Sequence, residues 1–354
     1  MPLRLRSALS LACLYLLTTC TGWIFSHIGV PLPWMIGALV ASASVYISGI
    51  MTQRVPVQTR PFGQMTIAAQ VGLAFTPAAL SALTSLAPLM IGAALISAVL
   101  ASMVAVLTAR IGDMRLPQAF LATFPTSPVE AAVMAEKLDC DSAPIVLSQT
   151  MRIAAVVILV PLSVYAVDGW PDRSSIVRGG SFDPIGNGLL ALLALAGALS
   201  FRKLRLSNPF FLGPLAFSAA AAACELPLTA FPPQMLAAAQ VVLGTWLGST
   251  FRRDLLLKGG RLLATSALGT LLLLGTIAAV SVGLAKATGL HWEILVLGMA
   301  PGGVTEMALT AKFLGVDLAL VTAFQLSRIF IFMPNIPWII RLISRFEKRR
   351  TPDQ

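Results

Sequence analysis

The stretch PGGVTEMALTAKFLGVDLALVTAFQLSR, from Pro301 to Arg328, decides the architecture expected for this chain. It lies between long apolar runs, yet it contains a Pro-Gly-Gly break, a glutamate, a glutamine and an arginine. A proline or glycine break frees backbone N–H and C=O groups that hydrocarbon cannot satisfy, so such breaks persist only beside protein or water. The stretch therefore predicts polar chemistry inside an apolar setting.

The composition places this setting in a membrane. The chain has 354 residues, of which 57% are hydrophobic and only 11% are charged, whereas soluble domains carry about 25% charged residues. We therefore expect an all-α polytopic membrane protein with the lipid bilayer as its main partner. The net charge of +10 comes from short loops and a basic tail, which are typical of topology signals and a cytoplasmic anchor. We expect no nucleic-acid partner.

The sequence contains an internal repeat, because adding 176 to a residue number repeatedly finds the same residue type. PLPWMIGALVAS (31–42) falls on SNPFFLGPLAFS (207–218), and segment 125–161 matches its partner at 11 of 37 positions. The matched residues there include polar ones, and an intact partner for the N-terminal apolar stretch argues against the alternative of a cleaved signal peptide.

The repeat predicts three parts: a first membrane repeat at 1–176, a second at 177–340 and a basic cytoplasmic tail at 341–354. Each repeat is predicted to hold about five spanning helices and one re-entrant or broken hairpin. The predicted spans are 7–27, 30–50, 62–77, 86–109, 143–167, 185–201, 208–226, 232–250, 262–285 and 318–340, with hairpins near 117–138 and 293–313.

An odd number of crossings per repeat turns the second repeat upside down. With a cytoplasmic N-terminus, this arrangement places 19 Lys and Arg residues on the inner side and 4 on the outer side, as the positive-inside rule requires. Two full spans in place of each hairpin would give parallel repeats instead. We expect inverted repeats in a bacterial-type plasma (inner) membrane, with both termini cytoplasmic.

The expected site lies at the two breaks, since inverted repeats with facing broken helices are typical of secondary transporters. Glu130 and Glu306 each fall early in the half-helix after a break, where they either hold a cation or proton or only cap that helix. The substrate or ion pathway is predicted to comprise Glu130, Glu306, Gln149, Gln325, Arg152, Arg328, Pro125, Thr126, Ser127, Pro301, Gly302, Gly303 and Thr305.

The spacing Gln-x-x-Arg puts the two polar side chains of the following span on one helix face. Arg152 and Arg328 are each deep in a predicted span and need partners, and each lies 22 residues after Glu130 or Glu306. We therefore expect a Glu–Arg pair in each repeat. It either lines a central pathway or locks the hairpin to the span as a structural ion pair.

Four further polar residues form two matched pairs. Gln64 and Gln240 lie within spans and favour interhelical hydrogen bonds, whereas Asp141 and Asp317 each precede a span, as an N-cap does. The sequence contains no Walker loop, no HExxH and no CxxC pair among its four cysteines. We expect no cofactor and no metal site.

The duplicated hairpin, the Gln-x-x-Arg span and the Pro-x-x-x-Gly helix resemble the AbrB-type membrane protein family over about residues 10–340. Family members are often labelled ammonia monooxygenases or membrane regulators of gene expression. The first break departs from the family pattern, because Pro125-Thr126-Ser127-Pro128 stands where Pro-Gly-Gly is usual. Oxygenase chemistry needs clustered His and carboxylate ligands, and this chain has two histidines, so we do not expect that activity.

The leading interpretation is a secondary transporter for a small polar or charged solute, coupled to a proton or cation, and not an enzyme. The alternative is a membrane regulator or sensor that changes gene expression without transport. The sequence leaves the solute open and is compatible with a homo-oligomer.

Overall fold

The protein is all-helical throughout the part that the structure, a computed structural model, describes. The described residues are 3–53, 55–126, 128–136, 138, 140, 142–169, 183–206, 208–251, 253, 260–332, 335–336 and 338–343. They form two compact units, each assembled from separate stretches of both repeats. Unit 1 comprises Met1–Leu86, Ile158–Arg252 and Val304–Thr322, and unit 2 comprises Ala87–Val157, Arg253–Gly303 and Ala323–Gln354.

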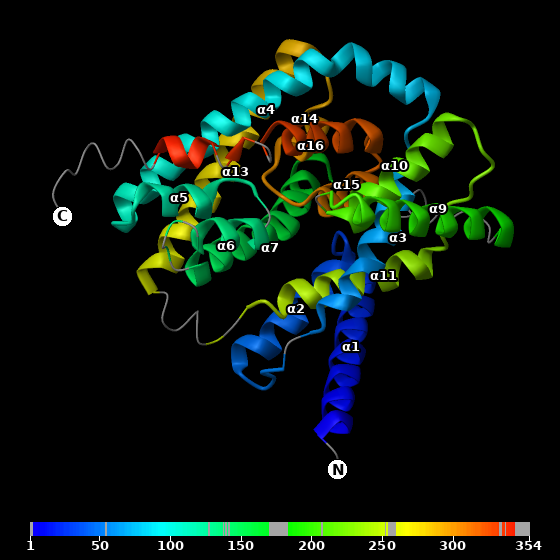
Figure 1. The fold of residues 1–354 in the computed structure, drawn as a ribbon, viewed down its shortest axis with the longest axis horizontal. Helices are drawn as coiled ribbons and strands as arrows, with labels where there is room; N and C mark the ends of the chain where they lie inside the picture. The colour runs from blue at the N-terminus through cyan, green and yellow to red at the C-terminus, as the bar shows by residue number, and fades with distance from the viewer. Residues whose placement is uncertain are drawn as a thin grey trace. The chain divides into compact units, whose positions relative to one another are not determined.

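Unit 1 contains seven of the helices labelled in Figure 1. They are α1 (Leu3–Ile28), α2 (Pro33–Ser48), α3 (Arg60–Gly72), α9 (Pro184–Lys203), α10 (Pro209–Ala223), α11 (Pro233–Gly248) and α15 (Val304–Leu314). Five of these helices have a proline at the first or second position, where its fixed φ suits a helix and its missing N–H is not needed.

Unit 2 contains the remaining half-helices and most of the long helices. They are α5 (Leu116–Thr123), α6 (Pro128–Glu136), α13 (Gly260–Thr288) and α14 (Trp292–Met299), with the larger parts of α4 (Pro77–Gly112), α7 (Ser142–Asp168) and α16 (Leu318–Phe332). The first turns of α4 and the last turns of α7 belong to unit 1. Pro88 lies inside α4 and Pro161 inside α7, close to the places where each helix passes between units.

The helix bounds confirm the duplication. Adding 176 to the bounds of α5 gives those of α14, and the same shift carries the starts of α2, α6 and α7 onto the starts of α10, α15 and α16. The first break therefore has the same length as the second. Its Pro-Thr-Ser sequence interrupts the helix where Pro-Gly-Gly does in the other repeat.

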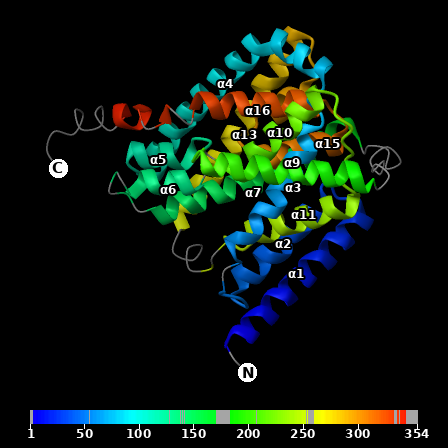
Figure 2. The same cartoon turned by 45° about the vertical axis from the view of Figure 1, so that its right-hand side comes forward.

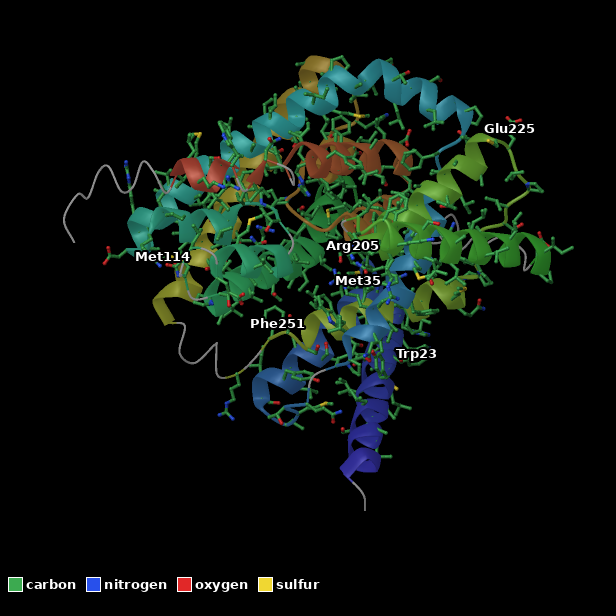
Figure 3. All side chains as sticks on the ribbon, in the orientation of Figure 1. Trp23, Met35, Met114, Arg205, Glu225 and Phe251 are labelled. Carbon is green, nitrogen blue, oxygen red and sulfur yellow. The ribbon has the colours of Figure 1, made fainter. Side chains whose placement is uncertain are left out.

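Left-handed backbone conformations repeat with the same period. Gly49 (φ 79°) corresponds to Glu225 (φ 56°), and Asp113 (φ 54°) corresponds to Gly289 (φ 75°). Two more pairs follow the rule, Gly29 with Arg205 and Leu32 with Asn208. Figure 3 labels Arg205 and Glu225, which close α9 and α10. Because only glycine adopts this region freely, the helix connections kept their shape even where glycine was replaced.

Within unit 1 the two repeats are interlocked. Helix α2 packs on α11 and α3 packs on α10, so these helices of the first repeat are covered by helices of the second (Figures 1 and 2). The contact points are also related by the repeat: a methyl group on Gly72 would overlap Ser218, and one on Gly248 would overlap Ser42. Small residues of this kind let membrane helices approach backbone to backbone.

Five helices are long and apolar enough to cross a membrane, at Ala8–Ile28, Pro77–Gly112, Ser142–Val167, Pro184–Lys203 and Ala264–Thr288. Three further apolar helices are shorter, namely α2, α10 and α16. The predicted span at 62–77 is shorter than expected, because α3 has 13 residues and reaches only about 20 Å at 1.5 Å per residue. Its residues from Gly63 to Gly72 are almost all buried, so neighbouring helices rather than lipid surround it.

Candidate functional site

The two breaks end one half-helix and begin another in each repeat. Helix α5 ends at Thr123 and α6 begins at Pro128, while α14 ends at Met299 and α15 begins at Val304. Phe124 and Ala300, the first residues after α5 and α14, are extended, with ψ of 135° and 136°. The last carbonyls of α5 and α14 therefore lose their helical partners and need other donors.

In the first repeat these donors come from α7. The Gln149 Nε2 donates to the carbonyl oxygens of Leu121 (2.5 Å) and Phe124 (2.9 Å). The Arg152 Nη1 donates to the carbonyl oxygens of Thr123 (2.9 Å) and Phe124 (3.0 Å). The Gln149–Arg152 pair thus caps the C-terminal end of α5, where a positive charge also complements the helix dipole.

The Arg152 guanidinium uses its remaining donors on the same break and on the other one. Its Nη2 donates to Gln149 Oε1 (2.5 Å) and to the carbonyl oxygen of Thr126 (3.5 Å). Its Nε donates to the carbonyl oxygen of Pro301 at 3.0 Å. All five N–H groups of this guanidinium are therefore directed at uncharged oxygens.

The second repeat copies this arrangement with α16 and α14. The Gln325 Nε2 donates to the carbonyl oxygens of Leu297 (2.5 Å) and Ala300 (3.1 Å). The Arg328 Nη1 donates to the carbonyl oxygens of Met299 (3.3 Å) and Ala300 (2.5 Å). We call each Gln-x-x-Arg pair with its bound carbonyls a clamp, Gln149–Arg152 being the first clamp and Gln325–Arg328 the second.

The Nη2 of Arg328 completes the second clamp. It donates to Gln325 Oε1 (2.6 Å) and to the carbonyl oxygen of Gly302 (3.0 Å). Both glutamines are fully buried, and the two arginines are only 3% and 4% exposed. Because Arg152 binds Pro301 and Arg328 binds Ala300, two guanidinium groups meet at consecutive peptide units of unit 2.

One of the differences between the clamps explains why residue 298 is a glycine. In the first repeat Ser148 Oγ donates to the carbonyl oxygen of Ala122 at 3.2 Å. The corresponding residue in the second repeat is Phe324, and a Cβ on Gly298 would lie 2.7 Å from the Phe324 Cβ. Residue 298 must therefore be a glycine, because its neighbour in the second repeat is Phe324 rather than a serine.

The expected Glu–Arg pair of the first repeat stays a prediction, because the Glu130 side chain lies outside the described residues. Among the described residues, every acceptor of Arg152 and Arg328 is a backbone carbonyl or a glutamine amide. These carbonyls are within reach because each helix break lies against the Gln-x-x-Arg face. The spacing predicted this shared face correctly and did not predict the carbonyl acceptors.

Glu306 has a different cationic neighbour. It lies in the first turn of α15, and within unit 1 the charge that acts on its carboxylate is that of Arg60. Arg60 begins α3, and its guanidinium carbon lies 4.3 Å from the centre of the Trp246 ring, as in a cation–π contact. Arg60 precedes the predicted span at 62–77, so it is one of the 19 cations predicted on the inner side. Neither Arg60 nor Trp246 has a like residue in the other repeat, so the duplication gave no signal.

The two matched glutamines, Gln64 and Gln240, differ in their hydrogen bonding. Gln64 Nε2 donates to Asn208 Oδ1 at 3.4 Å, between α3 and the start of α10. The residue that corresponds to Asn208 is Leu32, which offers no side-chain acceptor or donor, and the buried Oε1 of Gln240 has no hydrogen-bond partner. Among the described residues, an interhelical hydrogen bond is thus found for Gln64 and not for the Gln240 Oε1.

Some of the remaining predicted residues lie in the described part of the structure, and others lie outside it. Asp317 Oδ1 accepts from the Leu320 N–H at 2.9 Å, which is the contact of an N-cap on α16. Thr126 and Thr305 are buried, and Gly303 ends the segment Arg253–Gly303 of unit 2. Ser127, Asp141 and the side chain of Glu130 lie outside the described residues.

Comparisons with known proteins agree on the relationship. A sequence profile described as transition state regulatory protein AbrB matches the chain twice, at residues 2–168 and 52–344. The protein YhjN of Bacillus subtilis (strain 168) is 26% identical over 346 residues, covering 91% of this chain and 90% of YhjN. An Escherichia coli (strain K12) protein named as a regulator, AbrB, is 24% identical over 344 residues, covering 96% of this chain and 97% of that protein.

The apolar helices, the duplication and the two clamped breaks define a helical membrane protein with a broken-helix hairpin in each repeat. The double match of the profile extends this class to a family. The chain belongs to the AbrB family.

Proposed function

We propose that the protein is a secondary transporter of a bacterial-type inner membrane, carrying a small polar or charged solute and catalysing no reaction. The observation that carries the proposal is the pair of clamps. Both repeats keep a helix break between apolar segments and keep two buried side chains to satisfy it. Non-helical backbone at membrane depth is typical of sites that bind a solute or an ion.

The proposed coupling group is Glu306, which takes up and releases a proton or binds a cation. Its place in the first turn of α15 and its cationic neighbour Arg60 support this role. An ionisable residue between apolar segments is costly and is usually retained for function. Arg60, held over Trp246, is proposed as a positioning residue that acts through Glu306. Glu130 is proposed as the corresponding group of the first repeat.

Alternating access is proposed to come from movement of the two compact units rather than of the two repeats. The chain passes between the units near Pro88 of α4, near Pro161 of α7, between Arg252 and Arg253, after Gly303 and within α16 between Thr322 and Ala323. Proline removes a helical hydrogen bond and weakens the helix at that point. Bending at these positions would let each unit keep its internal packing. The positive-inside count supports a cytoplasmic position for both termini.

A second function is supported by the names of the relatives. The matching profile is described as a regulatory protein and the Escherichia coli relative is named as a regulator. In this alternative the protein senses a solute and changes gene expression through a partner, without carrying anything across the membrane. A regulatory effect can also follow from transport, since flux changes the concentration that another protein senses.

Flux measured in proteoliposomes tests the proposal. The purified chain is reconstituted and tested for uptake and exchange of a panel of small solutes, with and without an imposed pH gradient. We expect Arg328→Ala to lose flux and Glu306→Gln to keep exchange but lose accumulation driven by the gradient. Arg60→Gln should weaken accumulation, and the double variant Arg60→Gln/Glu306→Gln should be no worse than Glu306→Gln alone.

The control is Arg110→Ala, which removes an exposed arginine at the end of α4 and should leave flux unchanged. Thermal unfolding of each variant in detergent shows that a lost flux is not a lost fold. Absence of flux for every solute, with the wild type folded, would overturn the transporter proposal and favour the regulator.

A further inference from the structure

We propose that the ion coupled to transport is a proton carried by Glu306 and not a metal cation, because the guanidiniums of Arg152 and Arg328 fill the cation positions of the broken helices. This inference rests on the proposed transport function and names its coupling ion. In transporters with broken helices, unwound carbonyls and the C-terminal ends of half-helices coordinate sodium ions or protons. The clamps lie at two such ends, those of α5 and α14.

The carbonyl oxygens at both ends are already bound by a positive charge. Each guanidinium donates through its Nη atoms to three carbonyl oxygens of its own break. They are the oxygens of Thr123, Phe124 and Thr126 for Arg152 and of Met299, Ala300 and Gly302 for Arg328, at 2.5–3.5 Å. A sodium ion coordinated by the same oxygens would lie beside a guanidinium, and like charges between apolar segments repel strongly.

These guanidiniums stay in place while a solute binds and leaves. In the described part of unit 2, Arg152 donates to five oxygens, including the carbonyl of Pro301 in the other break, and Arg328 donates to four. Both side chains are buried. Withdrawing either one would leave buried oxygens without a donor, which is costly. The protein's own side chains therefore hold these positions permanently, and a coupling ion must bind elsewhere.

In unit 1 the carboxylate of Glu306 also lies among positive charges. It is in the first turn of α15, and the N-terminal end of a helix carries roughly half a positive charge. Helix α3 packs against α15, and the charge of Arg60, the first residue of α3, acts on this carboxylate. A metal ion needs several oxygen ligands at once and would face both positive charges. The surroundings of Glu306 are therefore unsuited to a metal ion.

A proton has neither difficulty to the same degree, because it needs a single oxygen. It adds to a lone pair of one carboxylate oxygen and forms an O–H bond, which leaves a neutral carboxyl group. Arg60 favours the ionised carboxylate, while the buried surroundings of α15 favour the neutral carboxyl. Because these effects oppose each other, Glu306 can take up a proton on one side of the membrane and release it on the other.

Other titratable residues lie on or beside α15. Lys312 follows Glu306 by six residues, which is about 9 Å along the helix axis. Tyr165 of α7 is in ring contact with Phe313, with the two ring centroids 5.9 Å apart. Both lie toward the C-terminal end of α15, whereas Glu306 is in its first turn. Arg60 is the residue whose charge acts on Glu306, so the proton affinity of Glu306 depends on Arg60.

Accumulation in proteoliposomes tests the coupling ion. The full-length chain is reconstituted and given labelled pyruvate, alanine, phosphate, choline or glycerol under an inward proton gradient alone or an inward sodium gradient alone, with the membrane voltage clamped. We expect a solute to accumulate under the proton gradient and none to accumulate under the sodium gradient. Glu306→Gln should abolish this accumulation. The matched control Glu225→Gln, which removes an exposed carboxylate after α10, should keep it.

Two measurements on the purified protein need no transported solute. Infrared difference spectra between high and low pH should contain a carboxylic-acid band that is present in wild type and in Glu225→Gln and is missing in Glu306→Gln. The thermal midpoint of wild type should be the same in sodium chloride and in choline chloride of equal ionic strength, because a specifically bound sodium ion would raise it.

The outcomes separate the two proposals. Accumulation driven by the sodium gradient, or exchange without accumulation under either gradient, would overturn the proton inference and leave transport in place. Proton-driven accumulation that survives Glu306→Gln would overturn the assignment to Glu306. No movement of any solute would overturn transport, and the purified protein then decides the inference: a missing Glu306 band or a midpoint raised by sodium overturns it.

Discussion

Arg152 donates its Nε–H to the carbonyl oxygen of Pro301 at 3.0 Å, so an arginine of the first repeat holds the break of the second. The same guanidinium caps α5 in its own repeat. One side chain therefore fixes the backbone of two interrupted hairpins at once. The clamps are not independent copies, because this crossing bond is made by Arg152 alone among the two arginines.

Removing the Arg152 side chain should destabilise unit 2 more than removing the Arg328 side chain. Arg152→Ala removes a donor from five oxygens, of which the Phe124 carbonyl keeps a second donor from Gln149, and we expect a loss of about 3 kcal/mol in the free energy of unfolding. Arg152→Lys should not rescue it, because an ammonium lacks the planar fork. Thermal unfolding in detergent measures this, with Arg110→Ala as the control. Equal midpoints for the Arg152 and Arg110 variants would contradict the clamp.

The interlocked helices predict a rescue. Gly248→Ala forces a methyl group into Ser42 on α2, and overpacking of this kind costs about 1–3 kcal/mol. The double variant Gly248→Ala/Ser42→Gly should recover only part of the loss, because the added Cβ would still lie 2.5 Å from the Leu39 carbonyl oxygen and 2.8 Å from the Ala43 backbone nitrogen. Gly92→Ala is the control, because an added Cβ there meets nothing within 4 Å and alanine favours helix. A double variant as unstable as Gly248→Ala alone would show that the contact is not the cause.

The repeated left-handed turns predict a stabilising substitution. Glu225 has φ 56°, where its counterpart is Gly49, and an L-residue in this region costs about 1 kcal/mol. Glu225→Gly should therefore raise the thermal midpoint, while the reciprocal Gly49→Ala should lower it. A fall in the midpoint for Glu225→Gly would mean that the Glu225 side chain contributes more than its backbone costs.

A carboxylate at the start of α9 predicts a pH dependence. Hydrogen bonds from Thr229 Oγ1 and from the N–H groups of Gly186 and Ile185 hold the pKa of the Asp183 carboxyl below its ordinary value. Asp183 thus stabilises the fold above the unfolded-state pKa of about 3.9, and this contribution disappears as the pH falls through the lower folded-state pKa.

The measurement is the thermal midpoint against pH for wild type and Asp183→Asn. The two curves should lie apart at neutral pH, with wild type more stable, and should converge below about pH 4. A constant separation down to the lowest pH would show that Asp183 is not the titrating group.

Much of this fold follows from the sequence because the chain repeats. The offset of 176 predicted both breaks, and the structure places them at corresponding residues. The pattern of apolar residues predicted helices, but it overestimated the length of α3. A short helix enclosed by protein is as apolar as a helix in lipid. The spacing from Gln149 to Arg152 predicted a shared face correctly.

The hydrogen-bond partners of Gln149 and Arg152 could not be predicted from the sequence in the same way. The acceptors are backbone carbonyls, which no residue letter marks, and a carboxylate 22 residues upstream looked like the natural partner. A count of freed carbonyls at the end of α5 would have indicated the need for donors there. The contact of Arg60 with Trp246 and its charge on Glu306 arise from tertiary packing that is not duplicated.

The exchange of helices between repeats in unit 1 has a consequence for how such a chain could arise. Gly72 packs against Ser218 and Gly248 packs against Ser42. A single repeat expressed alone would therefore leave these packing faces exposed. A second copy of the same polypeptide would cover them by the same contacts. One covalent chain therefore contains the interface that two half-length chains would form, and two separately produced halves should associate through these contacts.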